Sequence, residues 1–190
     1  NASIAEDSIA SGDLNATDAD GLSDGSYFSV STAPANGSAS INPLDGNWTY
    51  SPNPNFFGSD SFVVSVTDDL NTSSTTTISL SVSSVDDATS ISGDTNASIA
   101  EDSSASGDLN ATDPDGLTDG SYFLISTAPA NGSASIDPLD GNWTYSPNPN
   151  FFGSDSFVVS VTDDLNSSLT TTISLSVSSV DDATSISGDT

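Results

Sequence analysis

The 190-residue sequence contains no lysine, no arginine, no histidine and no cysteine. Its 27 acidic residues therefore have no cationic side chain to pair with, and the formal net charge is −27. A chain without cationic side chains cannot neutralise phosphates, which excludes nucleic acids and anionic membrane surfaces as partners. The missing residues also exclude Ser-His and Cys-His nucleophile pairs, Schiff bases and zinc sites with nitrogen or sulfur ligands. The sequence therefore predicts no catalytic residues and no enzyme.

Long apolar segments and disulfides are missing as well. No apolar run approaches 18 residues, and no segment has the order of regions that defines a signal peptide. We therefore expect no membrane insertion, and without cysteine no disulfide holds the fold. The first residue is Asn1 rather than methionine, which suggests a piece of a longer protein.

The sequence consists of two copies of one 95-residue module. Residues 1–95 and 96–190 align without a gap and differ at eight positions: Ile9/Ser104, Ala19/Pro114, Ser23/Thr118, Ser29/Leu124, Val30/Ile125, Asn42/Asp137, Thr72/Ser167 and Ser74/Leu169. A period of 95 residues is too long for a solenoid repeat and long enough for a domain. We expect one domain over 1–87, with an incomplete first strand, a second over 88–182, and the start of a further repeat over 183–190.

Each copy has the pattern of short strands separated by turns. In the second copy, residues 172–178 alternate Ser or Thr with apolar residues, and Trp143 and Tyr145 alternate with polar neighbours. Turn residues such as Asp-Pro-Asp-Gly separate these segments, and no segment has a helical period. The pattern predicts seven strands: 90–99, 104–112, 121–126, 132–137, 142–146, 156–162 and 169–179. The expected fold is all-β, with tandem antiparallel β-sandwich domains joined by a short linker.

The acidic residues gather in the loops that would meet at the linker. In a seven-stranded sandwich, the loops after the second and sixth strands share the pole where the chain enters, and the turns after the first and fifth strands share the opposite pole. The two facing poles and the linker hold ten acids: Asp113, Asp115, Asp119, Asp163, Asp164, Asp86, Asp87, Glu6, Asp7 and Asp60. Carboxylates so close repel one another, and Ca²⁺, which takes six to eight oxygen ligands, relieves that repulsion. The sequence therefore predicts a Ca²⁺ site at the junction.

Several segments resemble the bacterial cadherin-like tandem repeats of the VCBS type. They are Gly-Asn-Trp-Thr-Tyr-Ser-Pro at 141–147, Phe-Gly-Ser-Asp-Ser-Phe at 152–157, Val-Thr-Asp at 161–163 and Val-Asp-Asp-Ala at 180–183. The resemblance covers each whole 95-residue unit. It implies extender repeats of a giant bacterial adhesin, extracellular, at the cell surface or secreted, with adjacent repeats of the same chain as partners and Ca²⁺ as the stiffening ion.

The resemblance also implies a set of metal ligands. The linker aspartates, the Asp-x-Asp motif, the late aspartate and the glutamate after the first strand all have counterparts here, whereas the Asp-Arg-Glu element of cadherins is reduced to Ser59-Asp60-Ser61. The expected ligands are Glu6, Asp60, Asp86, Asp87, Asp113, Asp115 and Asp163.

Three other interpretations of the sequence stay open. The exposed Thr rows or the strand with Trp143 and Tyr145 could bind carbohydrate or ice, although alternating aromatics more often form a core face. Residues 183–190 repeat the segment 88–95 that the first copy lacks, so copies could assemble head to tail into a fibre by strand addition. The acids could also serve only to solvate the surface.

Overall fold

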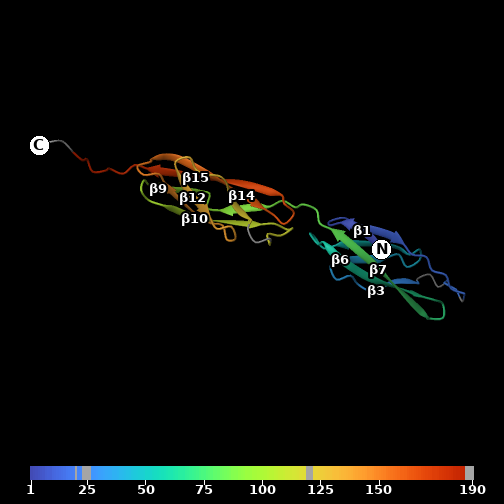
Figure 1. Cartoon of the computed structure of the whole chain (residues 1–190). Helices are drawn as coiled ribbons and strands as arrows, with labels where there is room; N and C mark the ends of the chain where they lie inside the picture. Colours follow the sequence, from blue (N-terminus) through green and yellow to red (C-terminus); the bar gives the residue numbers. More distant parts are fainter. Residues whose placement is uncertain (20, 23–26, 119–121, 187–190) are drawn as a thin grey trace. The chain divides into compact units, whose positions relative to one another are not determined.

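The computed structural model describes residues 1–19, 21–22, 27–118 and 122–186, and the chain divides into two compact units, Asn1–Val85 and Asp86–Thr190. The described residues form fifteen strands and no helix, so the predicted all-β fold is confirmed (Figure 1). Within this part of the chain, no helix has the length and apolar character needed to cross a membrane.

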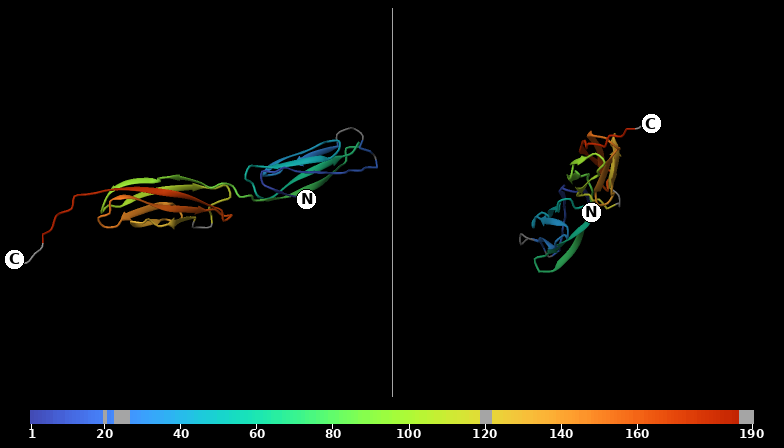
Figure 2. Two further views of the ribbon diagram at one scale, coloured as in Figure 1. Left: turned by 90° about the horizontal axis from the view of Figure 1, so that it is seen from above. Right: turned by 90° about the vertical axis from the view of Figure 1, so that its left-hand side faces the viewer.

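The second unit is a sandwich of two four-stranded sheets. Its strands are β8 (Ser90–Gly93), β9 (Asn96–Ala100), β10 (Ala105–Thr112), β11 (Phe123–Thr127), β12 (Gly132–Ile136), β13 (Asn142–Pro147), β14 (Gly153–Thr162) and β15 (Ser168–Ser178). One sheet has the order β9-β15-β14-β11 and the other the order β8-β10-β13-β12. The two layers of this unit are separate in Figure 2.

The first unit repeats this plan with one strand fewer. Its strands are β1 (Ala2–Ala5), β2 (Ala10–Asp13), β3 (Phe28–Thr32), β4 (Gly37–Ile41), β5 (Asn47–Pro52), β6 (Gly58–Thr67) and β7 (Ser73–Ser83). The sheets have the orders β1-β7-β6-β3 and β2-β5-β4. The strand that corresponds to β8 has no counterpart in the described part of this unit.

The core of each unit is formed by alternate residues of facing strands. Trp143 and Tyr145 of β13 are 1% and 0% exposed and pack toward the opposite sheet, where Phe157 meets the indole edge to face at 5.7 Å between ring centroids. Trp48 and Tyr50 occupy the same places in the first unit. These aromatic pairs are therefore core residues, and they do not form an exposed platform for sugars.

The predicted first strand of the second copy, 90–99, is wrong in one respect, because the structure divides it in two. β8 pairs antiparallel with β10, whereas β9 pairs parallel with β15 in the other sheet. The chain crosses between the sheets at Gly93, whose φ of +111° is unfavourable for residues with a side chain. Beyond it, the Asp94 carbonyl accepts a hydrogen bond from Trp143 Nε1 at 3.1 Å. The alternation of polar and apolar residues continues through Gly93, so the sequence pattern does not show that the chain changes sheets there.

Candidate metal-binding site

The loop after β10 places two carboxylates side by side at the pole where the chain enters the second unit. Asp113 Oδ1 accepts a hydrogen bond from the Asp115 backbone nitrogen at 2.8 Å, which is the local turn that aspartate favours. Gly116 follows with a φ of +109° and lets the chain bend back. The Asp-Pro-Asp-Gly sequence thus folds into a tight turn that presents the carboxylates of Asp113 and Asp115 together.

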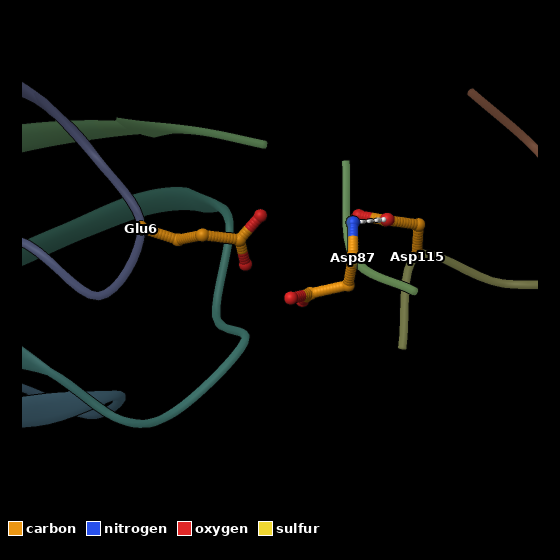
Figure 3. A group of neighbouring side chains, drawn as sticks. All are labelled: Glu6, Asp87 and Asp115. Atoms are coloured by element: carbon orange, nitrogen blue, oxygen red, sulfur yellow. Dashed lines mark hydrogen bonds between the residues drawn. The ribbon is translucent and has the colours of Figure 1, made fainter. Parts of the chain in front are cut away.

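Residues at the start of the second unit donate hydrogen bonds to these two carboxylates. The Thr89 hydroxyl donates to Asp113 Oδ2 at 2.7 Å, and the Asp87 backbone nitrogen donates to Asp115 Oδ2 at 2.7 Å. Figure 3 shows the second of these bonds as a dashed line and also draws the side chain of Glu6. A carboxylate oxygen of Asp87 lies within 4.8 Å of one of Asp115. Residues 87–89 are therefore held by the same loop that supplies the acids.

A third buried carboxylate comes from the turn between β14 and β15. Asp163 is 1% exposed, and its Oδ1 accepts hydrogen bonds from the backbone nitrogens of Leu165 and Ser167, both at 2.9 Å. The Asp164 nitrogen donates to the Gly116 carbonyl at 3.1 Å, which joins this turn to the loop after β10. The two acidic loops are therefore neighbours at one pole of the second unit.

Two of these buried carboxylates are incompletely satisfied. Asp115 is 7% exposed, and neither its Oδ1 nor Asp163 Oδ2 has a hydrogen-bond partner within the described residues. A buried charge without a partner costs several kcal/mol (on the order of 3–5 for a pair that has lost one member), and this chain has no cationic side chain to offset that cost. Oxygen atoms in this condition fit a hard divalent cation such as Ca²⁺, which binds carboxylate oxygens at short distance.

The opposite pole of each unit buries a glutamate against the departing chain. In the first unit, the Val85 nitrogen donates to Glu6 Oε1 at 2.6 Å, and the Glu6 nitrogen donates to the Ser83 carbonyl at 2.9 Å. In the second unit, Val180 donates to Glu101 Oε1 at 2.5 Å. Glu6 and Glu101 are 4% and 5% exposed. Because both copies have this arrangement, it is a property of the module.

Asp60 lies on β6 and is engaged in a structural network. Its two oxygens accept hydrogen bonds from the backbone nitrogens of Ala35, Asn36 and Ser61 and from the Tyr50 hydroxyl, at 2.8 to 3.1 Å. Burial by itself raises the pKa of the Asp60 carboxyl, but the hydrogen bonds outweigh burial, and the net pKa is lowered.

The expected ligands thus fall into distinct places. Four of the seven lie at one pole of the second unit: Asp87, Asp113, Asp115 and Asp163. Glu6 lies at the pole where the chain leaves the first unit, Asp60 lies within β6, and Asp86 is exposed in the linker. Asp119 lies outside the described residues. The sequence reasoning missed Thr89, whose hydroxyl holds Asp113; a threonine two residues after Asp87 was the available signal.

Comparison with protein families assigns each unit. Residues 1–84 match the family model of the bacterial cadherin-like domain, and residues 86–176 match that of the bacterial Ig domain. The chain is a tandem of bacterial cadherin-like and Ig-like domains. The resemblance seen in the sequence is therefore confirmed. Since the two sequence copies, 1–95 and 96–190, differ at only eight positions, the two family models describe the same module here.

Solved structures similar to this cadherin-like tandem include extracellular cadherin domains. Domains 1–5 of protocadherin gamma B2 match with a TM-score of 0.61 and 12% identity, covering 94% of this chain and 38% of that one. Domains 3–6 of protocadherin gammaB7, in a cis-dimer structure, match with a TM-score of 0.52 and 17% identity, covering 81% and 40%. The chain thus spans less than half the length of these proteins, and the likeness shows the fold alone. A comparison with curated protein sequences gives no match.

Proposed function

We propose that this chain is a non-catalytic structural extender of a large bacterial cell-surface or secreted adhesin, made rigid by Ca²⁺ between consecutive domains. The bacterial cadherin-like and Ig-like families support an extracellular structural or adhesive repeat. The observation that carries the calcium role is the pair of buried carboxylates, Asp115 and Asp163, each with an oxygen that lacks a hydrogen-bond partner in the described chain. No side chain of this protein is cationic, so a cation from solution is the natural partner for these oxygens.

The linker connects the two acidic poles through a very short stretch of backbone. The Val85 nitrogen donates a hydrogen bond to Glu6, and the Asp87 nitrogen donates one to Asp115. These two nitrogens are only two residues apart in the chain. An extended chain spans at most about 3.6 Å per residue, so these two nitrogens cannot separate by more than about 7 Å, whatever the orientation of the units. An ion bound by the pole of the second unit and the linker would therefore restrict the hinge itself.

The proposed ligands are six of the seven residues that the sequence indicated: Glu6, Asp86, Asp87, Asp113, Asp115 and Asp163. We give Asp60 a structural role instead, because its oxygens already accept four hydrogen bonds. The partners are adjacent repeats of the same chain, with the modules spanning 1–87 and 88–182 and a further repeat beginning at 183. A carbohydrate-binding role is not favoured, since the Trp and Tyr side chains that could stack on a sugar are buried.

The proposal is tested by thermal unfolding in Ca²⁺, in Mg²⁺ and in chelator at matched ionic strength. Binding to the folded state alone raises stability by about 2.7 kcal/mol when the ion is at 100 times its dissociation constant. We expect a rise of the melting temperature in Ca²⁺ that Asp115→Asn and Asp163→Asn reduce. Asp45→Asn is the matched control: it removes the same charge from an exposed turn, where Asp45 Oδ1 accepts a hydrogen bond from the Asn47 nitrogen that an amide oxygen can also accept.

Two results would contradict the calcium role. Equal melting temperatures in all three solutions would mean that the acids only solvate the surface. An equal loss of the Ca²⁺ effect in Asp45→Asn and Asp115→Asn would mean that the ion responds to net charge rather than to a site.

A further inference from the structure

Asp164 follows the buried Asp163 in the turn between β14 and β15, but the two carboxylates are engaged differently. Asp164 Oδ1 accepts a hydrogen bond from the Thr118 nitrogen at 2.8 Å, and Asp164 Oδ2 accepts one from the Thr118 hydroxyl at 2.5 Å. Asp163 Oδ2, in contrast, is buried and has no hydrogen-bond partner in the described chain. Asp163 therefore has an oxygen that a cation could use, whereas both oxygens of Asp164 hold Thr118.

The backbone of Asp164 binds the same loop at a second point. Its nitrogen donates to the Gly116 carbonyl at 3.1 Å, two residues before Thr118. Between these two bonded residues, Leu117 is partly buried and packs against the core of the second unit. The segment 116–118 is therefore fixed by hydrogen bonds to Asp164 on both sides of an apolar anchor.

Glycine at position 116 allows the Asp164 carboxylate to come this close. A Cβ at Gly116 would lie 2.7 Å from Asp164 Oδ2, which is closer than such carbon atoms come to a neighbour. The φ of Gly116, +109°, is also unfavourable for a residue with a side chain. Gly116 therefore lets the chain bend after Asp115 and leaves room for Asp164 beside the bend.

The segment 116–118 comes directly after two of the proposed ligands, Asp113 and Asp115. Without a cation, these carboxylates and that of Asp163 repel one another, and the repulsion favours an open loop. The hydrogen bonds from 116–118 to Asp164 oppose that opening, because they join the loop after β10 to the turn that carries Asp163. Their donors are N–H and O–H groups, so they form without any cation.

A loop that already has its binding conformation loses less conformational entropy when an ion binds, which raises the affinity. Residues that orient metal ligands without touching the metal typically contribute about 10–100-fold to metal affinity. The two bonds between Thr118 and Asp164 lie at an exposed position, where water competes with them. We therefore expect one of these bonds to contribute at the lower end of that range.

We propose that Asp164 and Thr118 are positioning residues of the calcium site, which hold the loop 113–118 in its binding conformation and thereby raise the affinity for Ca²⁺. This inference rests on the proposed calcium role. It gives Asp164 no contact with the ion, although the Asp-Asp sequence at 163–164 by itself suggests two ligands. The first copy has Ser23 at the position of Thr118, so both copies have a hydroxyl there.

The proposal is tested by titrating the full chain with Ca²⁺ while observing the backbone amide resonances of Asp115 and Asp163, which report on this site alone. Thr118→Val removes the hydroxyl and keeps the backbone nitrogen, the shape and the net charge. We expect it to weaken Ca²⁺ binding about tenfold, and Asp164→Ala, which removes both side-chain bonds, to weaken binding by up to about 100-fold. Thr118→Ser retains the hydroxyl and should bind Ca²⁺ like the unsubstituted chain.

Two controls separate positioning from net charge and from overall stability. Asp45→Ala removes one negative charge from an exposed turn of the first unit and should leave the titration unchanged. In chelator, the Asp164 amide, which donates to Gly116, should exchange with solvent faster in Thr118→Val than in the unsubstituted chain. The amides of β14 should keep their protection, since only the loop is released.

Each contrary result has a distinct meaning. Unchanged affinity in both Thr118→Val and Asp164→Ala overturns the positioning role and leaves the calcium role intact. A loss in Asp164→Ala without any loss in Thr118→Val also overturns it, because Asp164 would then bind the ion directly. Equal weakening in Thr118→Val and Thr118→Ser would mean that the hydroxyl is not the cause. If Ca²⁺ does not change the resonances of the unsubstituted chain, the calcium role fails and the positioning role fails with it.

Discussion

At the scale of single residues, a buried tyrosine and an aspartate connect the turn after β11 to β14. The Tyr145 hydroxyl donates to Asp155 Oδ2 at 2.9 Å, and the backbone nitrogens of Ala130 and Asn131 donate to the same carboxylate. Burial, together with the hydrogen bond and the charge of Asp155, raises the pKa of Tyr145 to about 12. The first unit repeats the pair as Asp60 and Tyr50.

The pair defines a pH range in which it stabilises the fold. Burial by itself raises the pKa of the Asp155 carboxyl, but the hydrogen bonds outweigh burial and the net pKa is lowered from 3.8. The stabilising contribution of Asp155 is therefore present above about pH 4 and is lost as pH falls through the lowered pKa. The contribution of Tyr145, whose pKa is raised, is present below pH 10 and is lost as pH rises toward 12.

We predict that Asp155→Asn destabilises the chain by about 1–3 kcal/mol at neutral pH, because an amide cannot accept hydrogen bonds on its nitrogen. Urea unfolding at several pH values measures the effect. The difference from the unsubstituted chain should shrink as pH falls below about 4 and through the lowered pKa of Asp155, because the wild-type carboxyl then becomes protonated too. Asp140→Asn is the control, since the exposed Asp140 accepts a single hydrogen bond from the described residues, that of the Asn142 nitrogen. An equal loss in both variants, or a difference that persists at pH 2, would contradict the prediction.

At the scale of elements, the division between β8 and β9 decides how the sandwich is closed. Gly93 and the residues beyond it carry the chain from one sheet to the other. A Cβ at Gly93 would lie 2.3 Å from the Asp108 carbonyl oxygen, a contact that the backbone cannot relieve without moving β8. Gly153 has a similar φ, +127°, but a Cβ there would meet nothing closer than 3.7 Å.

We predict that Gly93→Ala destabilises the second unit by more than Gly153→Ala does. The positive φ of Gly153 costs an alanine on the order of 1–3 kcal/mol, whereas Gly93 adds a clash with the backbone to a similar cost. Thermal unfolding measures stability, and the Trp143 indole resonance reports whether Asp94 still accepts its hydrogen bond. Equal losses in the two variants, with an unchanged Trp143 resonance, would mean that β8 adapts and that the crossing does not depend on glycine.

At the scale of the whole molecule, the calcium proposal makes a mechanical claim. Stabilisation alone would raise the melting temperature without changing the range of angles between the units. Stiffening requires that the ion restrict residues 85–87, which are bonded to Glu6 on one side and to Asp115 on the other.

We predict that Ca²⁺ narrows the distribution of distances in small-angle X-ray scattering, compared with chelator at the same ionic strength. Asp115→Asn should lose the narrowing, and Asp45→Asn should keep it. The sample is measured at a concentration where the chain is monomeric, so that contacts between copies do not contribute. A higher melting temperature with an unchanged scattering curve would mean that the ion stabilises the domains without stiffening the linker.

The sequence by itself determined the module, its strands and the kind of ion it could bind. The alternation around Trp143 and Tyr145 predicts their burial, because a strand turns successive side chains to opposite faces. The absence of every cationic side chain, together with paired aspartates in turns, favours a divalent cation over an ion pair. These are local properties, and a repeat that appears twice makes them easy to see.

Only the tertiary structure decided which aspartates have a structural role and which could bind a cation. Asp60 and Asp163 are both aspartates of the same module. Asp60 accepts hydrogen bonds from the backbone of a turn, whereas Asp163 is buried with one oxygen that has no hydrogen-bond partner in the described chain. Asp60 accepts hydrogen bonds from backbone nitrogens 24 and 25 residues away, whereas Asp163 accepts them from Leu165 and Ser167 in its own turn. No pattern within a strand contains that information.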